Sequence, residues 1–140
     1  MNPITYLTLL FASANGPQPT VECKSHFDTS VNMNVYTTVD LKPEYPGGAA
    51  AWGRFVNRNF REENIGTVNN CNVKIKMIIT AEGEIVKVVA LNGDAEVKEP
   101  NELEKEVVRM VRKSGRWVPG VCEGKQVTAE YVQTLSPCNR

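Results

Sequence analysis

Four cysteines and a single histidine are the side chains with the most distinctive chemistry in this sequence. Cys23, Cys71, Cys122 and Cys138 are widely spaced, and none forms the C-x-x-C pair of a zinc site or a thioredoxin-type motif. An even number of cysteines in an exported chain predicts two disulfides, and the alternative is that some or all of the thiols are free. His26 lies three residues from Cys23, but a nucleophilic Cys–His pair needs a fixed pocket and a third, orienting group. A proline-flanked polar arm supplies neither, so we expect a solvated histidine.

Other residue patterns do not indicate an active site either. One histidine and scattered carboxylates do not form a metal-ligand cluster, and Gly47-Gly48 lacks the Lys-Ser/Thr of a phosphate-binding loop. The "ENELEKE" carboxylates share their helix with basic residues and are typical of a solvated face. Lys+Arg is 16 and Asp+Glu is 16, without the basic excess of a phosphate-binding nucleic-acid protein. We therefore expect a non-enzymatic binding module with no metal, no cofactor and no nucleic-acid partner.

The N-terminal "MNPITYLTLLFASANG" resembles an export signal. The apolar run 4–11 is followed by Ala12-Ser13-Ala14, whose small residues predict a signal peptide over 1–14 that is cleaved after Ala14. No basic residue precedes the run, so a misassigned start or a buried apolar segment stays open as the alternative. The run is too short to span a bilayer as a helix, and we expect no transmembrane helix in the mature chain. The 140 residues suit one domain, with a mobile polar arm over 15–30 and a domain over 31–140.

Hydrophobic periodicity predicts the elements that would hold a binding site. Residues 31–41 alternate as a strand does, and Pro43 and Pro46 end that pattern. After Gly47-Gly48, apolar residues recur with helical spacing from Ala49 and fade near Asn64.

The second half of the sequence predicts a hairpin, a helix and a last strand. Runs 71–80 and 85–93 flank a tight turn at Gly83 and form an antiparallel pair. Asn101 and Glu104 resemble a capping box at the start of a helix, and 126–135 alternates again. The order β-α-β-β-α-β indicates an α+β fold, with two helices packed on a three-stranded antiparallel sheet and an extra N-terminal strand.

The strand directions predict which strands are neighbours. The last strand, 126–135, runs in the direction of 85–93, so in an antiparallel sheet it must lie beside 71–80. Cys138 then lies opposite Cys71 at a distance that a disulfide accepts, which favours Cys71–Cys138 and, by elimination, Cys23–Cys122.

The last strand would then lie at an edge of the sheet. Its unpaired backbone groups could accept an extended peptide; in the alternative, the first strand or a symmetry mate covers it and it is only structural. Before this strand, the turn "WVPG" holds Trp117 beside Pro119 and Gly120, and we expect that tryptophan to be buried.

Several stretches together resemble the C-terminal domain of TonB, in its Pro-x-Tyr-Pro-Gly-Gly variant. They are "VYTTVDLKPEYPGG", "VKIKMIITAEGEIVKVVALNG" and "WVPGVCEGKQV", and the resemblance covers about 31–135. It implies a periplasmic, non-enzymatic domain that engages outer-membrane transport proteins in energy-coupled transmembrane transport. A segment of a TonB-dependent receptor would add as a strand beside the last strand. A complete TonB also has an inner-membrane helix and a long spacer, so the leader and short arm expected here imply a stand-alone domain.

The resemblance also assigns residues. The partner-binding positions would be Leu41, Lys42, Glu44, Tyr45, Gln126, Val127, Thr128, Ala129, Glu130, Tyr131, Val132, Gln133, Thr134 and Leu135. The structural positions would be Pro46, Gly47, Gly48, Gly83, Trp117, Pro119 and Gly120. Lys42 stands where the family usually has glutamine. The alternative is a cell-envelope structural or adaptor module, in which the same sheet edge pairs with a second copy as a homodimer or with another envelope protein.

Overall fold

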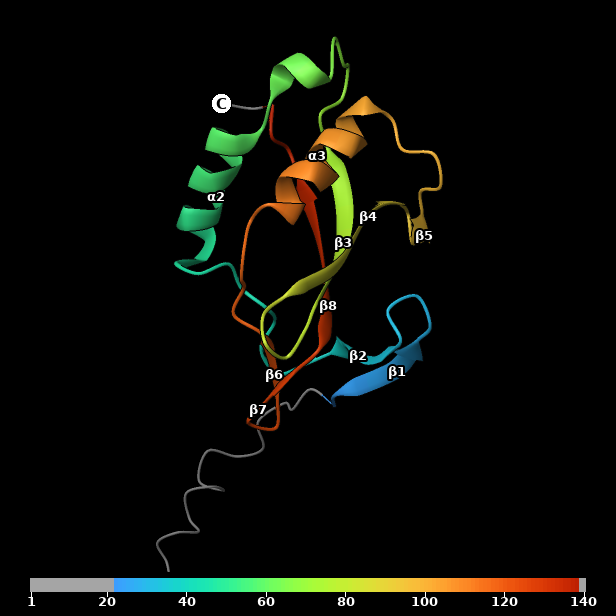
Figure 1. Ribbon diagram of the computed structural model, residues 1–140, viewed down its shortest axis with the longest axis vertical. Coiled ribbons are helices and arrows are strands. Elements are labelled where there is room, and N and C mark those ends of the chain that lie inside the picture. Colours follow the sequence, from blue (N-terminus) through green and yellow to red (C-terminus); the bar gives the residue numbers. More distant parts are fainter. Residues whose placement is uncertain (1–21, 139–140) are drawn as a thin grey trace, which may run out of the picture.

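The computed structural model describes residues 22–138, so the expected signal peptide and its cleavage site after Ala14 lie outside the described residues (Figure 1). The helices are α2 (Gly48–Asn59), the short 3-10 helix η1 (Glu62–Asn64) and α3 (Glu102–Arg112). The strands are β1 (Lys24–Asp28), β2 (Met33–Thr38), β3 (Val73–Ile79), β4 (Ile85–Asn92), β5 (Ala95–Glu96), β6 (Gly120–Cys122), β7 (Lys125–Val127) and β8 (Ala129–Leu135).

The fold is α+β, as the sequence predicts, but the expected three-stranded antiparallel sheet is wrong. Six strands form one mixed sheet in the order β1-β2-β8-β3-β4-β5, and β6 and β7 form a separate pair. Within the six, β3 lies between β4 and β8, so the predicted neighbours are confirmed. Met77 of β3 pairs with Val88 of β4 and with Tyr131 of β8, both antiparallel.

Two of the additional strands carry no apolar alternation that a sequence pattern could reveal. β1 falls within the stretch 15–30 that was expected as a mobile arm, and it pairs antiparallel with β2. Most of β1 and all of the two-residue β5 are exposed, so backbone pairing places them and not burial. The arm expectation is therefore wrong for Lys24–Asp28.

The expected single strand 126–135 is interrupted at Thr128. The Thr128 carbonyl accepts a hydrogen bond from Tyr36 N (2.8 Å), and its Oγ1 accepts one from Ala81 N (3.1 Å). On one side of this junction β7 pairs with β6, and on the other β8 joins the main sheet. Residues 126 and 127 therefore belong to the small sheet, which corrects the predicted strand boundary.

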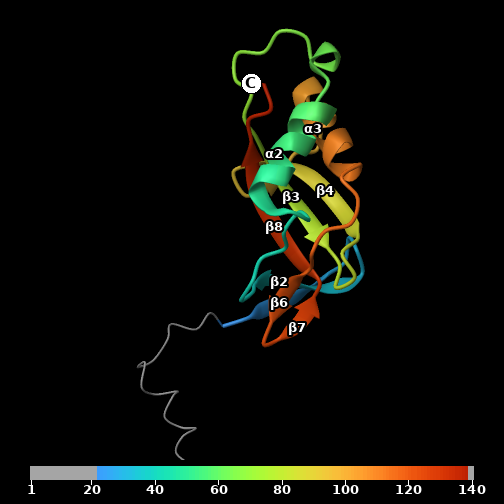
Figure 2. The ribbon, with the colours of Figure 1, turned by 90° about the vertical axis from the view of Figure 1, so that its left-hand side faces the viewer.

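The helices α2 and α3 cover one face of the main sheet (Figure 2). Buried side chains on this face alternate along the strands, as half-buried strands require, with Ile75, Met77 and Ile79 on β3 fully inaccessible. Val107 and Met110 of α3 pack in the same cluster. This core fixes β3 and, through its pairing, the neighbouring β8.

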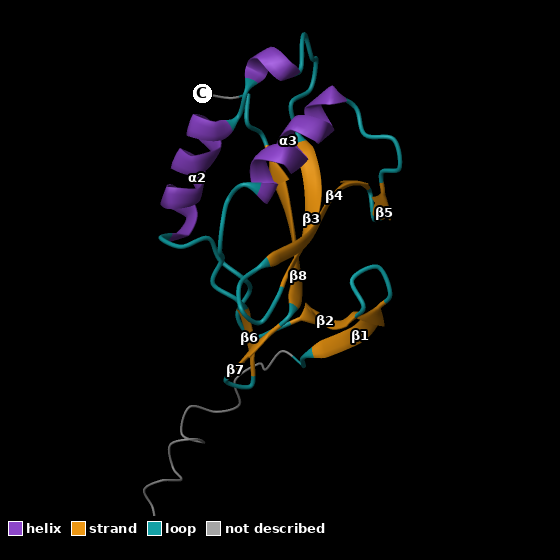
Figure 3. Ribbon diagram, in the orientation of Figure 1, coloured by secondary structure: helices purple, strands orange, loops and turns teal. Residues whose placement is uncertain are grey.

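The hairpin of β1 and β2 lies at the end of the molecule away from α2 and α3 (Figure 3). Lys87 Nζ of β4 donates to Ser30 Oγ in the turn of this hairpin over 2.8 Å. Val35 and Ile78 are both 0% exposed, although neither belongs to the main core cluster. The hairpin therefore contributes a second, smaller buried region.

The end of α2 is held to α3 by a buried carboxylate. Glu106 is 3% exposed and accepts from Arg61 N (2.9 Å), Asn64 Nδ2 (2.7 Å) and Arg109 Nε (2.8 Å). Because all these donors converge on one carboxylate, it acts as a structural crosslink between η1 and α3.

The predicted capping box of α3 is confirmed, with Asn101 and Glu104 exchanging hydrogen bonds.

Both predicted disulfides are confirmed. Cys71–Cys138 joins the segment before β3 to the segment after β8 with a Cα–Cα distance of 5.9 Å, and Cys23–Cys122 joins the residue before β1 to β6 at 6.3 Å. Among residues 22–138, none of the helices is long and apolar enough to cross a bilayer.

Candidate functional site

The outer edge of β8 is paired over only a small part of its length. On its inner side, β8 pairs with β3 from Ala129 to Leu135 without interruption. On its outer side, β2 meets it in parallel at a single position, Tyr36 opposite Ala129. Beyond that position, no strand in the described part of the chain pairs with the outer side of residues 131–135.

The register identifies the backbone groups that point outward. The Thr128 carbonyl bonds to β2, so it points away from β3. Because backbone groups alternate sides along a strand, those of Glu130, Val132 and Thr134 point outward as well. This edge could therefore hydrogen-bond with a further extended segment.

A groove of about 550 Å³ runs beside this edge on the helix-covered face. Tyr131 and Gln133 of β8 form one wall, and the start of α2 forms another. The lining residues are Leu41, Lys42, Pro43, Glu44, Tyr45, Gly48, Ala49, Trp52, Trp117, Val118, Pro119, Val121, Tyr131 and Gln133.

Aromatic rings form much of the groove wall. The ring centroid of Tyr45 lies 5.1 Å from that of Trp52 and 5.6 Å from that of Trp117. The ring centroids of Trp117 and Tyr131 are 6.0 Å apart. Such ring pairs are stabilising beyond their buried area. The aromatic part of the groove wall therefore consists of rings that pack on one another.

Trp117 anchors this cluster, and its predicted burial is confirmed. It is 3% exposed, and its Nε1 donates to Ser114 Oγ over 2.9 Å. Its backbone N donates to Gly83 O over 2.9 Å, which joins the turn between β3 and β4 to the segment before β6. A Cβ on Gly83 would lie 2.2 Å from the Trp117 carbonyl oxygen, so only glycine fits there.

The segment that precedes α2 is held against the turn after Trp117. Leu41 and Glu44 form isolated antiparallel bridges to Val121 and Val118. A Cβ on Gly120 would lie 3.3 Å from Leu41 O, so a glycine allows this close approach. Pro119 lines the groove between these two bridges.

The turn into α2 also depends on glycine. Gly47, which follows Pro46, has a φ of +92°, and a Cβ there would lie 2.8 Å from the Ala51 Cβ. Gly48, at φ +81°, begins α2. These residues bring Tyr45 and Trp52 to the same side of the groove.

A second hollow of about 350 Å³ lies by the same edge and is lined by Thr37, Thr38, Val39, Lys42, Glu130, Tyr131 and Val132. Side chains of consecutive strand residues point to opposite faces, so a hollow that touches Tyr131 and Val132 reaches around the edge of β8. An extended segment beside β8 would have one groove for each of its two rows of side chains.

Exposed apolar side chains border both hollows. Leu41 is 63% exposed, Val118 47% and Val132 39%. Exposed apolar surface that gathers beside a groove is typical of an interaction site.

The structure brings together some of the positions that the sequence assigned to partner binding, and separates others. Leu41, Lys42, Glu44 and Tyr45 share the groove with Tyr131 and Gln133. Gln126 and Val127 pair with β6 instead, Thr128 is occupied by two hydrogen bonds, and Ala129 is 0% exposed.

Sequence reasoning missed Trp52, Val118 and Val121 as groove residues. Trp52 was expected only as part of the helix that begins near Ala49, although it is partly exposed and lines the groove. A tryptophan at the start of a helix, close in sequence to Tyr45, was the available signal.

One group of three potential metal ligands is present within the described residues: Cys23, Asp40 and Cys122. The two sulfurs are joined in a disulfide, and Asp40 Oδ2 accepts from Glu123 N over 2.8 Å. The group is thus explained as a disulfide beside a structural carboxylate.

Comparison of the chain with models of known protein families, with curated proteins and with solved structures finds no match.

Proposed function

We propose that this protein is an exported, non-enzymatic binding domain that takes up an extended peptide segment as an additional strand on β8. The observation that carries the proposal is the outer edge of residues 131–135, which has no strand partner in the described chain and lies between two grooves. Strand addition suits such an edge because main-chain hydrogen bonds supply affinity and side-chain pockets supply specificity.

The proposed partner is a periplasm-facing segment of an outer-membrane TonB-dependent transport protein. Support comes from the resemblance of the sequence to the TonB C-terminal domain, whose partner contact corresponds to the last strand and the segment 41–45. Two disulfides also favour an oxidising compartment outside the cytoplasm. The proposed role is in energy-coupled transmembrane transport, where the domain binds the transport protein and catalyses no reaction.

The shape of the edge restricts the partner segment. Residues 131–135 span about 17 Å at the usual rise of a strand, so about five partner residues can pair. Partner side chains on the helix-covered face would meet Tyr45, Trp52 and Trp117, which favours large apolar side chains there. Those on the other face would meet Lys42, Glu130 and the exposed Val132, which favours side chains with an apolar stem and a polar end.

The decisive variant is Val132→Pro. The N–H of Val132 points away from β3, so proline at this position removes an outward donor and leaves the β3 ladder intact. Val132→Ala is the matched control, because it also removes the valine side chain but keeps the backbone N–H group. We expect peptides from receptor plug segments to shift the amide resonances of residues 130–135 in the wild-type protein and in Val132→Ala. Val132→Pro should bind at least tenfold more weakly, since it loses a hydrogen bond and introduces a steric block.

Two results would contradict the proposal. One is the absence of any shift along β8 across a panel of receptor peptides. The other is equal affinity of Val132→Pro and Val132→Ala, provided that both variants keep the native pattern of resonances elsewhere.

A second candidate function uses the same edge for self-association or for another envelope protein. The exposed Val132 and Leu41 favour it, because they lie by the outer side of β8, which beyond Ala129 has no strand partner in the described chain and can pair with a second copy. Light scattering that shows a concentration-dependent mass, abolished by Val132→Pro and unaffected by receptor peptides, would favour this alternative.

A further inference from the structure

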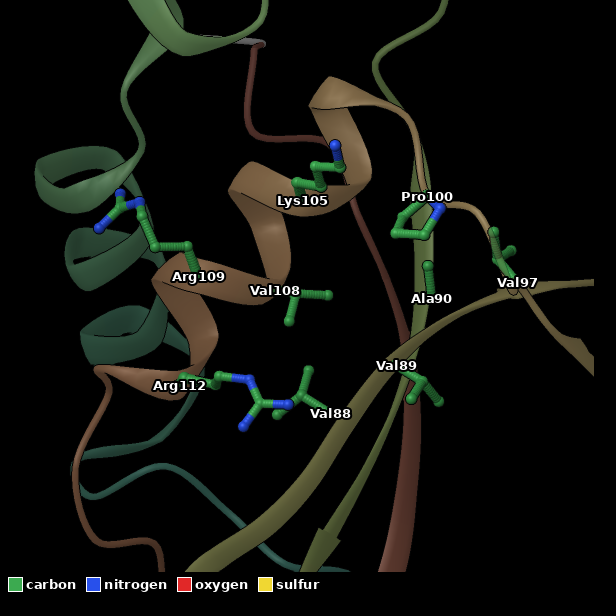
Figure 4. A pocket seen from close by; sticks show the side chains of 9 residues that line it. All are labelled: Val88, Val89, Ala90, Val97, Pro100, Lys105, Val108, Arg109 and Arg112. Atoms are coloured by element: carbon green, nitrogen blue, oxygen red, sulfur yellow. The ribbon is translucent and has the colours of Figure 1, made fainter.

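A separate hollow of about 400 Å³ lies between α3 and β4 (Figure 4). Its lining residues are Val88, Val89, Ala90, Val97, Pro100, Lys105, Val108, Arg109 and Arg112. β4 and β8 lie on opposite sides of β3, so this hollow is distinct from the two beside β8. Its volume is at the lower end of the range for small-molecule sites.

The interior of this hollow is apolar. Val88 and Ala90 come from β4, Val108 comes from α3, and Val97 and Pro100 come from the connection between β5 and α3. Val97 N donates to Ala90 O over 2.9 Å, which fixes that connection against the end of β4. One wall of the apolar trough is thus fixed to its floor by a backbone hydrogen bond.

The charged residues that line the hollow are all basic. Arg109 is already bound by Glu106 and donates to Asn59 O, so its charge is compensated. Lys105 Nζ forms an exposed ion pair with Glu102 over 3.3 Å, of the kind that contributes little.

Arg112 is different, because no hydrogen bond or ion pair joins its guanidinium group to another residue of the described chain. Figure 4 shows its guanidinium group reaching from α3 toward Val88 at one end of the trough. The site therefore combines an apolar trough with an uncompensated cation at its end.

We propose that this trough binds a free single-chain carboxylate amphiphile, such as a medium-chain fatty acid. Its carboxylate would pair with Arg112 and its alkyl chain would lie between Val108 of α3 and Val88 and Ala90 of β4. Guanidinium and carboxylate groups match in charge and geometry, and the alkyl chain gains from leaving water.

A peptide strand is a poorer occupant of the same place. The Ala90 carbonyl already accepts a hydrogen bond from Val97 N, so a strand laid in this apolar hollow would leave backbone groups of its own unpaired. An alkyl chain needs no backbone hydrogen bonds and can lie in the trough as it stands.

The test is a titration of the isotope-labelled whole chain, with both disulfides formed, with sodium decanoate below its micelle-forming concentration. We expect resonance shifts at Val88, Ala90, Val97 and Val108, and none along residues 131–135. Arg112→Gln should weaken binding about tenfold or more, since it removes the charge and the charge-assisted hydrogen bond and keeps a polar side chain. Lys113→Gln is the matched control, because Lys113 is the next basic residue and does not line the hollow; it should bind as the wild type does.

Decanol separates the contributions of the tail and the head group. Decanol should bind the wild type about tenfold or more weakly than decanoate does. Decanol and decanoate should bind Arg112→Gln with equal affinity. The proposal is overturned if decanoate binds Arg112→Gln and the wild type equally, if decanol matches decanoate, or if the shifts spread over the surface. It is likewise overturned if only vesicles of anionic phospholipid or an acidic peptide, and not free decanoate, shift these resonances.

Discussion

Trp52 Nε1 donates a hydrogen bond to Gln133 Oε1 over 3.1 Å, and so joins α2 to β8 across 81 residues of sequence. Gln133 also lies with its Nε2 3.7 Å from Met77 Sδ of β3. Both Trp52 and Gln133 line the larger groove beside the β8 edge. The hydrogen bond between Trp52 and Gln133, which joins α2 to β8, therefore lies within the proposed binding surface.

We expect Trp52→Phe to reduce the free energy of unfolding by about 1 kcal/mol through loss of this hydrogen bond, apart from the loss of ring area. A double-mutant cycle with Gln133→Leu isolates the pair, because the two side chains are in contact. Urea unfolding of the wild type, both single variants and the double variant measures the coupling. Strict additivity of the two single effects would show that the bond contributes nothing.

Stability should fall at acidic pH because of Glu106. Burial disfavours its charged form, but hydrogen bonds from Arg109, Asn64 and Arg61 N outweigh burial and lower the pKa of Glu106 from 4.5 to about 2. A carboxyl whose folded pKa is depressed contributes stability that is fully present above pH 4.5 and is lost as the pH falls toward 2. The shift corresponds to about 3 kcal/mol. Denaturant midpoints measured between pH 7 and pH 2 would show this decline.

Glu106→Gln tests the assignment of that decline. The amide cannot satisfy the guanidinium of Arg109, and its NH₂ group opposes the donors of Arg61 and Asn64, so we expect a loss of about 2–3 kcal/mol at pH 7. The difference between variant and wild type should shrink as the pH approaches 2. A constant difference over the whole range would mean that other carboxylates cause the acid sensitivity.

Gly83 and Gly93 form a matched pair for testing the contact with Trp117. Both have positive φ, +91° and +64°, but a Cβ on Gly83 would lie 2.2 Å from Trp117 O, whereas nothing lies within 4 Å of one on Gly93. Gly93→Ala should cost about 1 kcal/mol for its left-handed backbone alone. Gly83→Ala should cost about 2–4 kcal/mol, because Trp117 must also move. Thermal unfolding with tryptophan fluorescence measures both, and equal costs would exclude a tight packing role for Gly83.

The presence of both disulfides should be measurable by mass, and the loss of either should lower the free energy of unfolding. The oxidised chain should be lighter than the reduced chain by four hydrogen atoms, as two disulfides require. Replacing Cys71 and Cys138 together by serine should cost about 2–5 kcal/mol, because the bridge closes a long loop in the unfolded chain. Denaturation of this variant and of the equivalent Cys23 and Cys122 variant compares the two bridges. An unchanged unfolding free energy in either would show that its bridge does not constrain the unfolded chain.

The parts of the fold that could be predicted from sequence are those fixed by local patterns or by chain direction. Asn101 and Glu104 lie three residues apart, so a capping box at the start of α3 follows from sequence alone. The turn at Gly83 makes β3 and β4 antiparallel, and the direction of the last strand then places it beside β3. The pairing of Cys71 with Cys138 is a consequence of that placement.

The candidate site was only partly predictable. Tyr45 and Tyr131 were both assigned to partner contact, but Trp52 and Val118, which join them in one groove, were not. The predicted start of the last strand at Gln126 was wrong. The alternating pattern continues through Thr128, but the backbone changes its pairing partner there. Alternation reports which face a side chain occupies and says nothing about which strand lies alongside.

The sequence by itself determined the α+β class, the capped α3, the β3–β4 hairpin, both disulfide pairings and the burial of Trp117. Each of these depends on interactions between nearby residues or on the direction in which the chain must run. Only the tertiary structure decided that β1 pairs with β2, that β2 meets β8 at one position, and that within residues 22–138 the outer side of residues 131–135 has no strand partner beside the aromatic groove. These features are contacts between distant backbone segments, whose hydrogen bonds are the same for every side chain and therefore leave no mark in the sequence.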